Sequence, residues 1–412
     1  MKFTDFGFDD RLLEGIEASA YDEATPVQEQ VIPLVLAGKD IIASAQTGTG
    51  KTAAFLLPLI NKIISAPLNH HSITALIIVP TRELAVQIAQ HMEGLSYFTS
   101  VSSIAVYGGG DGNAFVQEKK ALSVGADVVV CTPGKMLAHI NMGYVKLQGL
   151  KYLVLDEADR MLDMGFYDDI MRIIHALPAK RQNLLFSATM PQKIRELARS
   201  ILHNPQEVSI SISKPNEKII QLAYVVYDTQ KIPLVKHLLL QKTFSSVLIF
   251  CSSKNSVKQL TRDLKRTKLA VDEIHSDLEQ QKREEVLMHF KSGRLQVLVA
   301  TDILSRGIDI DNINLVLNYD VPHDGEDYVH RIGRTARAAA EGTAITFISV
   351  KEQRKFAVIE RLLGKPVPKV AVPGEFGESP EYNPYTSRSA GQGRGQEHKS
   401  NKPSRHPKQV RK

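Results

Sequence analysis

The stretch Ala45-Gln46-Thr47-Gly48-Thr49-Gly50-Lys51-Thr52 decides the fold of this chain. The apolar run Asp40–Ser44 before it predicts a strand, and the run Ala53–Ile64 after it predicts a helix. A strand, a glycine-rich turn and Gly-Lys-Thr at the start of a helix are the context of a phosphate-binding loop (P-loop). The general pattern begins with glycine where this chain has Ala45, and an ordinary glycine-rich loop is the alternative interpretation.

The residue types in this stretch suit a nucleotide and a magnesium ion. Backbone N–H groups of the turn and of the helix N-terminus point toward phosphate oxygens. Gly48 and Gly50 permit the tight turn. Lys51 is expected to neutralise the β- and γ-phosphates, and Thr52 to offer its hydroxyl to Mg²⁺. The sequence therefore predicts a Mg²⁺-dependent nucleotide site.

Composition favours a globular protein in a reducing compartment. The 412 residues suggest about two to three domains. Cys131 and Cys251 each end an apolar run, so we expect buried thiols and no disulfide. No apolar run reaches membrane-spanning length, and the N-terminal residues lack the apolar core of a signal peptide. We expect a cytoplasmic protein that does not associate with membranes.

The positive charge is concentrated at the C-terminus. From Ser379 onward there are eight Lys or Arg residues against Glu381 and Glu397, which equals the net charge of +6 of the whole chain. The segment is also rich in Gly, Pro, Ser, Asn and Gln. We expect a disordered basic tail at residues 371–412 that contacts nucleic-acid phosphates. A tail that only solvates the protein is the alternative.

Short apolar runs alternate with helical patterns along the rest of the chain. Buried strands that alternate with helices indicate doubly wound parallel sheets. We expect strands at Asp40–Ser44, Ala75–Val79, Ser102–Val106, Asp127–Cys131, Tyr152–Leu155 and Asn183–Ser187, and we expect a segment near Glu207–Ser213 to close this domain. After a linker at residues 213–218, we expect strands at Gln221–Val226, Val247–Cys251, Val271–His275, Gln296–Ala300, Asn314–Leu317 and Thr343–Ile348.

This alternation divides the chain into two α/β domains, at residues 1–212 and 219–370, and the second has no P-loop of its own. Polar and glycine-rich residues follow the strands, where the ligands of such sheets bind. Asp156 and Glu157 come directly after one strand. Beside a P-loop, the first acid holds Mg²⁺ and the second polarises the attacking water. A turn or a helix cap is the alternative for these two acids.

Asp156-Glu157-Ala158-Asp159, taken with Ala45–Thr52, resembles the DEAD-box RNA helicases of superfamily two, whose members have two RecA-like domains. The resemblance extends over about residues 1 to 370 in the family's order, and the short core with its basic tail is most similar to bacterial RhlE-type members. The further matching motifs are Thr25–Gln28, Pro80–Ala85, Gly108-Gly109, Thr132–Gly134, Ser187–Thr189, Leu248–Cys251, Ala300–Asp302, Arg306–Asp309 and His330–Arg337.

The resemblance implies roles in ATP binding and hydrolysis. Gln28 reads the adenine edge, Phe3 stacks on adenine and Asp309 contacts the ribose. Arg334 and Arg337 of the second domain stabilise the negative charge that develops on the γ-phosphate, as arginine fingers do. Together with Lys51, Asp156 and Glu157 they form the implied catalytic set. Read without the resemblance, Phe3 is a core residue, and the arginines are solvated side chains at a helix start.

The resemblance also implies an RNA track and a coupling motif. Contacts to the RNA backbone carry no base sequence. The implied RNA-binding residues are Pro80, Thr81, Arg82, Gly109, Thr132, Gly134, Thr301 and Gly307. Ser187, Thr189 and His330 are expected to couple the state of ATP to the grip on RNA. The chain departs from the family's pattern at Lys135, Leu304, Ser305 and Ala336; Lys135 keeps the charge of the usual Arg but loses its bidentate fork.

Taken together, these features predict an ATP-dependent RNA helicase that uses ATP and Mg²⁺, binds single-stranded RNA and melts short duplexes locally. Ribosomal or RNA-decay complexes are the expected partners, and the core is expected to be monomeric. Two alternatives remain at this point. One is a DNA-directed motor of the same superfamily, and the other is an ATP-gated RNA clamp with little unwinding.

Overall fold

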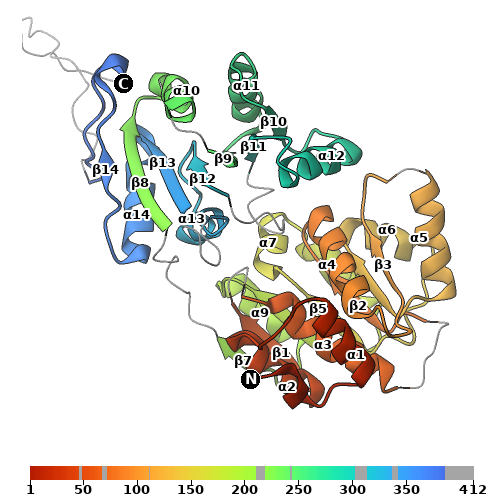
Figure 1. The fold of residues 1–412 in the computed structure, drawn as a ribbon. Coiled ribbons are helices and arrows are strands. Elements are labelled where there is room, and N and C mark those ends of the chain that lie inside the picture. The colour runs from red at the N-terminus through yellow and green to blue at the C-terminus, as the bar shows by residue number, and fades with distance from the viewer. Residues whose placement is uncertain are drawn as a thin grey trace, which may run out of the picture.

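The computed structural model describes residues 1–45, 49–66, 72–110, 112–209, 219–241, 244–301, 313–335 and 342–385. These residues form two α/β domains, each built on one sheet (Figure 1). Within the described part, each sheet has seven strands, and every strand pair is parallel. The prediction of two doubly wound parallel sheets is confirmed.

The first sheet has the strand order β3-β4-β2-β5-β6-β1-β7. Its strands are β1 (Ile41–Ser44), β2 (Ala75–Ile78), β3 (Ser103–Val106), β4 (Val128–Cys131), β5 (Tyr152–Leu155), β6 (Gln182–Ser187) and β7 (Gln206–Ser209). Each strand predicted from Asp40 to Ser187 is present, and its bounds differ from the prediction by at most one residue; the segment expected to close the domain near Glu207 is the strand β7. Buried β-branched and leucine side chains on both faces explain why the apolar runs were nearly continuous.

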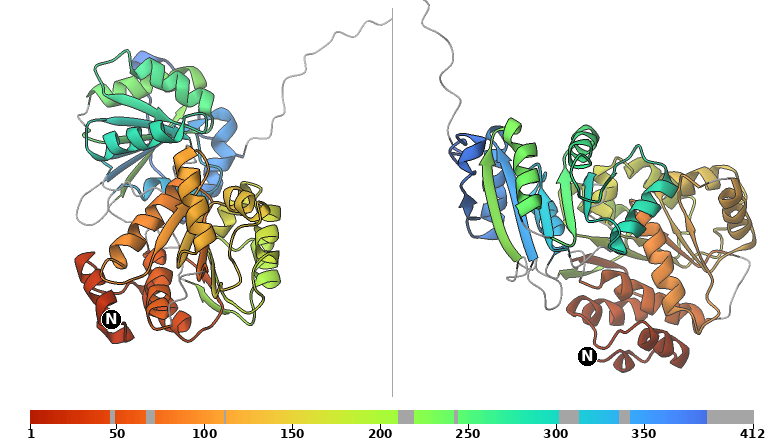
Figure 2. Two further views of the ribbon diagram at one scale, coloured as in Figure 1. Left: turned by 90° about the vertical axis from the view of Figure 1, so that its right-hand side faces the viewer. Right: turned by 45° about the horizontal axis from the view of Figure 1, so that its top comes forward.

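Helices cover both faces of the first sheet because the strand side chains alternate between two cores. Ile77 packs in a core with α1 to α4, whereas its neighbour Ile78 packs in a core with α6 to α9. The helices are α1 (Asp10–Ala18), α2 (Pro26–Leu36), α3 (Lys51–Ile64), α4 (Arg82–Leu95), α5 (Gly112–Val124), α6 (Pro133–Asn141), α7 (Ala158–Asp163), α8 (Tyr167–His175) and α9 (Gln192–Ile201). The N-terminus lies on the side of this domain away from the second sheet (Figure 2).

The second sheet repeats the topology of the first, with the order β10-β11-β9-β12-β13-β8-β14. Its strands are β8 (Ile219–Val226), β9 (Val247–Cys251), β10 (Val271–Ile274), β11 (Val297–Thr301), β12 (Leu315–Asn318), β13 (Gly342–Ser349) and β14 (Lys369–Val370). Its helices are α10 (Lys231–Gln241), α11 (Lys254–Leu264), α12 (Gln280–Lys291), α13 (Gly325–Ile332) and α14 (Gln353–Leu363). The cores place α10 and α11 on one face and α12 to α14 on the other.

Both cysteines are buried and free, as predicted. Burial raises the pKa of the Cys131 thiol well above its usual range, which leaves this thiol unreactive. Among the described helices, none has the length and apolar content needed to cross a membrane.

The start of the predicted disordered tail is wrong. Residues 371–385 lie on the second domain instead of leaving it at residue 371. Gln230 Nε2 donates to the carbonyls of Phe376 and Glu378 at 2.9 and 3.0 Å, and the Tyr382 hydroxyl donates to Glu360 at 2.6 Å. Proline and glycine made this segment look unstructured, but extended chain can be held by side-chain bonds to its carbonyls. The rest of the tail, residues 386–412, and the predicted linker lie outside the described residues, and the domain boundaries at residues 212 and 219 stay predictions.

One buried carboxylate fixes the start of β1, the strand that leads into the P-loop. Asp40 is 7% exposed and accepts hydrogen bonds from Asn183 N at 2.8 Å, Asn183 Nδ2 at 2.9 Å and His203 N at 2.8 Å. It therefore joins the starts of β1 and β6 to the connection that precedes β7. These bonds hold the register in which Ser44 pairs with Ser187.

We expect Asp40→Ala to destabilise the first domain by about 3 kcal/mol, because two backbone N–H groups lose their charged acceptor in a buried place. Hydrogen exchange of the amides in β1 and β6 is the measurement, since it reports the opening of this sheet separately from the second domain. Asp22→Ala, at an exposed position, is the control and should change the free energy by less than about 0.5 kcal/mol. Equal protection in the two variants would contradict this role of Asp40.

Candidate active site

The residues singled out in the sequence gather at one edge of the first sheet. In a parallel sheet all strands end at the same edge. The P-loop follows β1, Thr81 and Arg82 follow β2, Gly109 follows β3, and Thr132 follows β4. Asp156 follows β5, and Ser187 ends β6.

The P-loop is anchored from α2. Gly50 has φ +92°, which only glycine adopts without strain, and it immediately precedes α3. Gln28 Nε2 donates to the Gly50 carbonyl at 3.1 Å, while Gln28 Oε1 accepts from Thr25 N at 2.8 Å. A Cβ on Gly50 would lie 2.5 Å from Gln28 Nε2. Gln28 is 1% exposed, and its amide therefore fixes the last turn of the P-loop in this structure.

Lys51 fits a phosphate ligand. Its side chain is buried at 6% exposure, and its Nζ has no hydrogen-bond partner among the described residues. A buried ammonium without a partner is costly, and an anionic ligand relieves that cost. Thr52 is half-buried in the same first turn of α3. Ala45 is buried and donates its N–H to the Ser187 carbonyl at 3.2 Å, while Gln46, Thr47 and Gly48 lie outside the described residues.

Asp156 and Glu157 form a buried acidic pair beside Lys51. Burial raises the pKa of Asp156 to about 6; Lys51 opposes this rise, and Glu157 and Asp159 add to it. Glu157 has φ +51°, a strained conformation for a non-glycine residue, and its N–H donates to Asp156 Oδ1 at 2.9 Å. Glu157 Oε2 is buried without a partner in the described part of the chain. Both acids suit cationic or polarised ligands, Mg²⁺ and water among them.

The Ser187–Thr189 segment is bonded to the same acidic motif. Thr189 donates from N and from Oγ1 to Asp159 Oδ2, each at 3.1 Å. Ser187 Oγ donates to the Thr189 carbonyl at 2.7 Å. A movement of α7, which carries Asp159, therefore pulls directly on the end of β6. This is the geometry that a coupling motif needs; the coupling itself stays a prediction.

Arg82 and Gly109 depend on each other. Arg82 begins α4, which Thr81 caps by accepting from Leu84 N at 3.3 Å. Gly109 has φ +92°, and a Cβ built on it would lie 2.2 Å from Arg82 Nη1. The Arg82 guanidinium thus lies against the backbone of the glycine turn after β3. Pro80, which directly precedes Thr81 in the chain, is buried.

Thr132 and Gly134 lie at the start of α6, with Pro133 in the first helical turn. A Cβ on Gly134 would have no atom nearer than 4.0 Å and Gly134 is exposed, whereas Thr132 and Pro133 are buried. Lys135, which replaces the usual Arg, is turned toward the protein. Its Nζ lies 2.8 Å from Glu118 Oε2, and Glu118 also contacts the buried His139 at 3.1 Å. The charge of Lys135 is therefore matched inside the protein.

The remaining predicted residues belong to the second domain, where the Arg334 carbonyl accepts from Ile313 N at 3.2 Å, just before the amino end of β12. Thr301 ends β11, and its Oγ1 has no partner among the described residues. His330 is buried on α13, and Arg334 is 6% exposed just after that helix. Gly307, Asp309 and Arg337 lie outside the described residues.

Phe3 lies in the core. It is 3% exposed, within a short helical turn at Phe3–Phe6, and its ring packs edge-to-face on Tyr21 at 6.0 Å. This agrees with the interpretation of Phe3 from the residues alone. Stacking on adenine stays a prediction from the resemblance.

An ion pair between the two domains was not anticipated. Arg283 Nη2 on α12 lies 2.7 Å from Glu83 Oε1 on α4, and both side chains are less than a tenth exposed. In Figure 1, α12 is the helix of the second domain that lies next to α4. A cavity of about 670 Å³ adjoins the pair between the two helices, lined by Gln87, Tyr107 and Gln280 among others. Glu83 stood inside the quoted stretch Pro80–Ala85, but nothing in the sequence pointed to Arg283.

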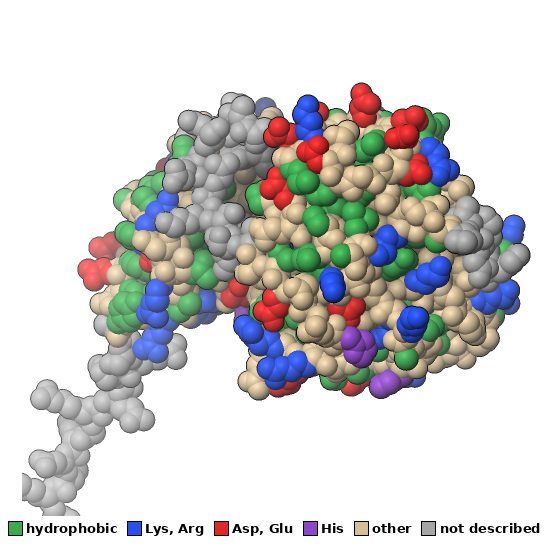
Figure 3. All heavy atoms as spheres, turned by 90° about the horizontal axis from the view of Figure 1, so that it is seen from below, with side chains coloured by type: hydrophobic (Ala, Val, Ile, Leu, Met, Phe, Trp, Pro, Cys, Tyr) green, Lys and Arg blue, Asp and Glu red, His purple; other side chains and the backbone are tan. Residues whose placement is uncertain are grey.

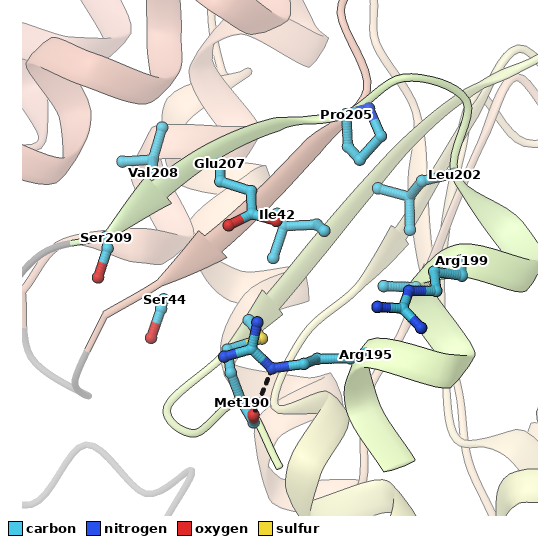
Figure 4. A pocket seen from close by; sticks show the side chains of 11 residues that line it. Ile42, Ser44, Met190, Arg195, Arg199, Leu202, Pro205, Glu207, Val208 and Ser209 are labelled. Atoms are coloured by element: carbon cyan, nitrogen blue, oxygen red, sulfur yellow. Dashed lines mark hydrogen bonds between the residues drawn. The ribbon is translucent and has the colours of Figure 1, made fainter. Parts of the chain in front are cut away.

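A second cavity, of about 400 Å³, lies between α9 and the edge strand β7 (Figure 4). Arg195 and Arg199 come from α9, and Arg195 Nε donates to the Met190 carbonyl at 3.1 Å. This second cavity lies on the face of the sheet that α9 covers, opposite to the face that α3 covers. None of the predicted site residues lines it.

The charged side chains on the surface are mixed in sign. The face seen in Figure 3 carries both Lys or Arg and Asp or Glu side chains over the described residues. This agrees with a net charge that resides mainly in the C-terminal segment.

Comparisons with known proteins place the chain in a family. Residues 25–197 match the DEAD/DEAH box helicase model, and residues 230–339 match the helicase conserved C-terminal domain. The ATP-dependent RNA helicase CshA of Listeria monocytogenes is 44% identical over 373 residues, which cover 90% of this chain and 71% of that protein. The ATP-dependent RNA helicase DbpA of Bacillus subtilis is 40% identical over 90% of this chain and 77% of its own length.

Solved structures agree with the sequence comparisons. S. cerevisiae Dbp5 bound to RNA and ADP BeF3 superimposes with a TM-score of 0.81 and 32% identity, over 90% of this chain and 95% of that one. Mss116p bound to single-stranded RNA and AMP-PNP gives a TM-score of 0.80 with 28% identity, over 90% of this chain and 79% of that one. The two sheets are RecA-like domains in tandem, as predicted, and the chain belongs to the DEAD-box helicase family.

Proposed function

We propose that this chain is an ATP-dependent RNA helicase, an RNA-stimulated ATPase that melts short duplexes locally and releases RNA after ATP hydrolysis. The observation that carries the proposal is the sheet edge where Lys51, without a partner among the described residues, lies beside Asp156 and Glu157. At that edge Thr189 donates two hydrogen bonds to Asp159 of the acidic motif. Membership of the DEAD-box family supports the same activity.

The proposed hydrolysis uses residues of both domains. Lys51 and the P-loop backbone, from Ala45 through Gln46, Thr47, Gly48, Thr49 and Gly50, bind the phosphates of ATP. Mg²⁺, when bound at Thr52 and Asp156, offsets phosphate charge. Glu157 orients the attacking water, and Arg334 and Arg337 stabilise the charge on the γ-phosphate. Gln28 and Phe3 contact the base, and Asp309 contacts the ribose.

The proposed RNA track runs along the other strand ends. Arg82 offers a guanidinium, and Thr81 and Thr132 offer hydroxyls, to phosphate and ribose groups. Gly134 leaves space at the start of α6 where RNA approaches, and Gly109 lets the Arg82 guanidinium lie against its backbone. Pro80, Thr301 and Gly307 complete the track. Contacts to 2′-hydroxyls would distinguish RNA from DNA.

The wider setting is also a proposal. The chain works as a monomeric core in the cytoplasm, at residues 1–212 and 219–370, and joins ribosomal or RNA-decay complexes. The RhlE-like subtype rests on the short core and the basic C-terminal segment. ATP hydrolysis with single-stranded RNA, with DNA of the same sequence and without nucleic acid tests the function. Equal stimulation by DNA would favour a DNA-directed motor instead.

Glu157→Gln should lower turnover at saturating ATP and RNA by about a thousandfold or more, because the amide cannot accept a proton from water. ATP-dependent RNA binding should persist, since the P-loop is unchanged. Steady-state hydrolysis and filter binding measure the two effects. Glu93→Gln, at an exposed position on α4, is the control. Turnover close to that of the unmodified protein would remove Glu157 from the catalytic set.

Gly109→Ala should weaken RNA binding about tenfold, because a Cβ displaces the Arg82 guanidinium and the positive φ becomes strained. Fluorescence anisotropy with labelled single-stranded RNA and a non-hydrolysable ATP analogue measures the affinity. Gly112→Ala is the matched control, because a Cβ there has no atom within 4 Å. If both variants bind RNA equally well, the turn after β3 does not belong to the RNA track.

Truncation after Tyr385 should weaken RNA binding and flatten its salt dependence, since residues 386–412 hold eight Lys or Arg and a single acid. Turnover at saturating RNA should be nearly unchanged. The cut leaves the packed residues 371–385 intact. A full-length variant with these eight residues changed to Gln separates charge from chain length. An unchanged salt slope in both variants would show that the segment only solvates the protein.

A further inference from the structure

Two residues of the second domain occupy the positions that Lys51 and Asp156 hold in the first. The two sheets share one strand order, in which β8 corresponds to β1 and β12 to β5. Lys51 begins the helix after β1, and Lys231 begins the helix after β8. Asp156 follows the end of β5, and Asp320 follows the end of β12 by two residues. The second domain therefore carries a lysine and an aspartate at the counterpart of the phosphate site.

The two pairs differ in how their charges are met. Lys51 Nζ has no hydrogen-bond partner among the described residues, whereas Lys231 Nζ donates to Asp320 Oδ1 at 2.8 Å. Lys231 also lies 3.6 Å from both Asp228 and Glu352, with a side chain 3% exposed. Burial works to lower the pKa of Lys231, but Asp320 and Glu352 outweigh it and hold this pKa above its usual value.

Asp320 is fully bonded as well. Its Oδ2 accepts from the N and the Oγ of Ser252, at the end of β9, each at 2.9 Å. Burial works to raise the pKa of Asp320, but Lys231 outweighs it and holds this pKa below its usual value. The pair therefore stays ionised at neutral pH and ties the ends of β8, β9 and β12 together.

This site does not suit a phosphate. The connection Tyr227–Gln230, which replaces the P-loop, contains no glycine and forms a short 3₁₀ turn at Asp228–Gln230. Three carboxylates surround one ammonium, so the local charge is negative. An anion would be repelled where the first domain attracts one. An internal carboxylate, Asp320, stands in for the ligand.

The pair is continuous with the segment that carries Arg334. The carbonyl of Asp320 accepts from Arg331 Nη1 at 3.3 Å, and Asn318 Oδ1 accepts from the same nitrogen at 3.0 Å. The Arg331 guanidinium also lies over the Phe250 ring at 5.0 Å and is 1% exposed. Arg331 is on α13, and the Arg334 N–H donates to the Arg331 carbonyl at 3.2 Å. Arg331 therefore connects the end of β12 to the backbone N–H of Arg334.

We propose that Lys231 and Asp320 are positioning residues for ATP hydrolysis: their ion pair takes the place of a nucleotide in the second domain and holds α13 so that Arg334 meets the transferred phosphate. The proposal rests on the proposed function, because it assumes that Arg334 acts on ATP. In this proposal the second sheet has, at the topological counterpart of the P-loop site, a site that is closed by its own side chains.

The test uses the full chain with Lys231→Met/Asp320→Asn. This double variant removes both charges of the pair together, so Asp320 is not left as an unpaired buried carboxylate, and the amide introduced at position 320 still has an oxygen that accepts from Ser252. At saturating ATP and RNA we expect turnover to fall about tenfold, with KM for ATP changed less than about twofold, because ATP binds mainly to the first domain. Lys231→Met alone should lose more, since Asp320 and Glu352 then lack their cation.

Transition-state binding separates positioning from a merely structural role. With RNA present, the ratio of affinities for ADP with aluminium fluoride and for ADP alone should fall about tenfold in the double variant. A loss of folded protein would lower both affinities and leave the ratio unchanged. Lys236→Met is the matched control on the same helix: its ammonium lies 3.5 Å from Asp263 at a partly exposed site, and its ratio should stay that of the unmodified protein.

The outcomes separate this inference from the proposed function. If the unmodified chain shows no RNA-stimulated hydrolysis, the proposed function fails. If that hydrolysis is present and the double variant keeps both its turnover and its affinity ratio, the positioning role is overturned. A fall in turnover with an unchanged ratio also overturns it, because the pair would then only stabilise the domain.

Discussion

Parallel pairing is the constraint on which the rest of this structure depends. When all strands of a sheet run the same way, all their carboxyl ends meet at one edge, and every loop that follows a strand opens there. In the first domain this brings residues from β1 to β6 together, although Ser44 and Ser187 are far apart in sequence. The sheets need buried apolar strands and helices on both faces. That requirement explains why the core is so regular while the chemistry is confined to one rim.

The carboxyl edge of the first sheet contains a strained backbone and buried charged groups, which a stable core normally lacks. Glu157 takes a left-handed backbone conformation, Asp156 is buried close to other acids, and Lys51 is buried without a described partner. Each of these features costs free energy, and each persists because the surrounding sheet over-determines it. The second domain has the same topology without this cost, since Lys231 and Asp320 satisfy each other. The same fold thus occurs twice in this chain. In the first domain the edge of the sheet has buried charged groups that suit a ligand, and in the second domain the corresponding charges pair with each other.

The sequence predicted the strands and the fold class well, because buried parallel strands leave short apolar runs bounded by turn residues. It also located the P-loop and Asp156, whose residue types are dictated by phosphate and metal chemistry. It did not identify the hydrogen bonds and ion pairs between residues that are far apart in the sequence. Asp40 reaches Asn183 and His203, and Glu83 meets Arg283, only once the chain is folded. The sequence did not predict the packing of residues 371–385 for a related reason. Their backbone carbonyls accept hydrogen bonds from side chains elsewhere in the chain, and such bonds leave no periodic pattern in the sequence.

Lys51, whose ammonium has no hydrogen-bond partner among the described residues, has a consequence for the protein in a cell. A ligand that binds only the folded state stabilises it by mass action, in proportion to the logarithm of its free concentration over its dissociation constant. A buried ammonium that lacks a partner among the described residues makes the first domain depend on such a ligand more than the second. Depletion of nucleotide would then loosen one half of the molecule and spare the other. The stability of the folded first domain would then rise and fall with the concentration of ATP.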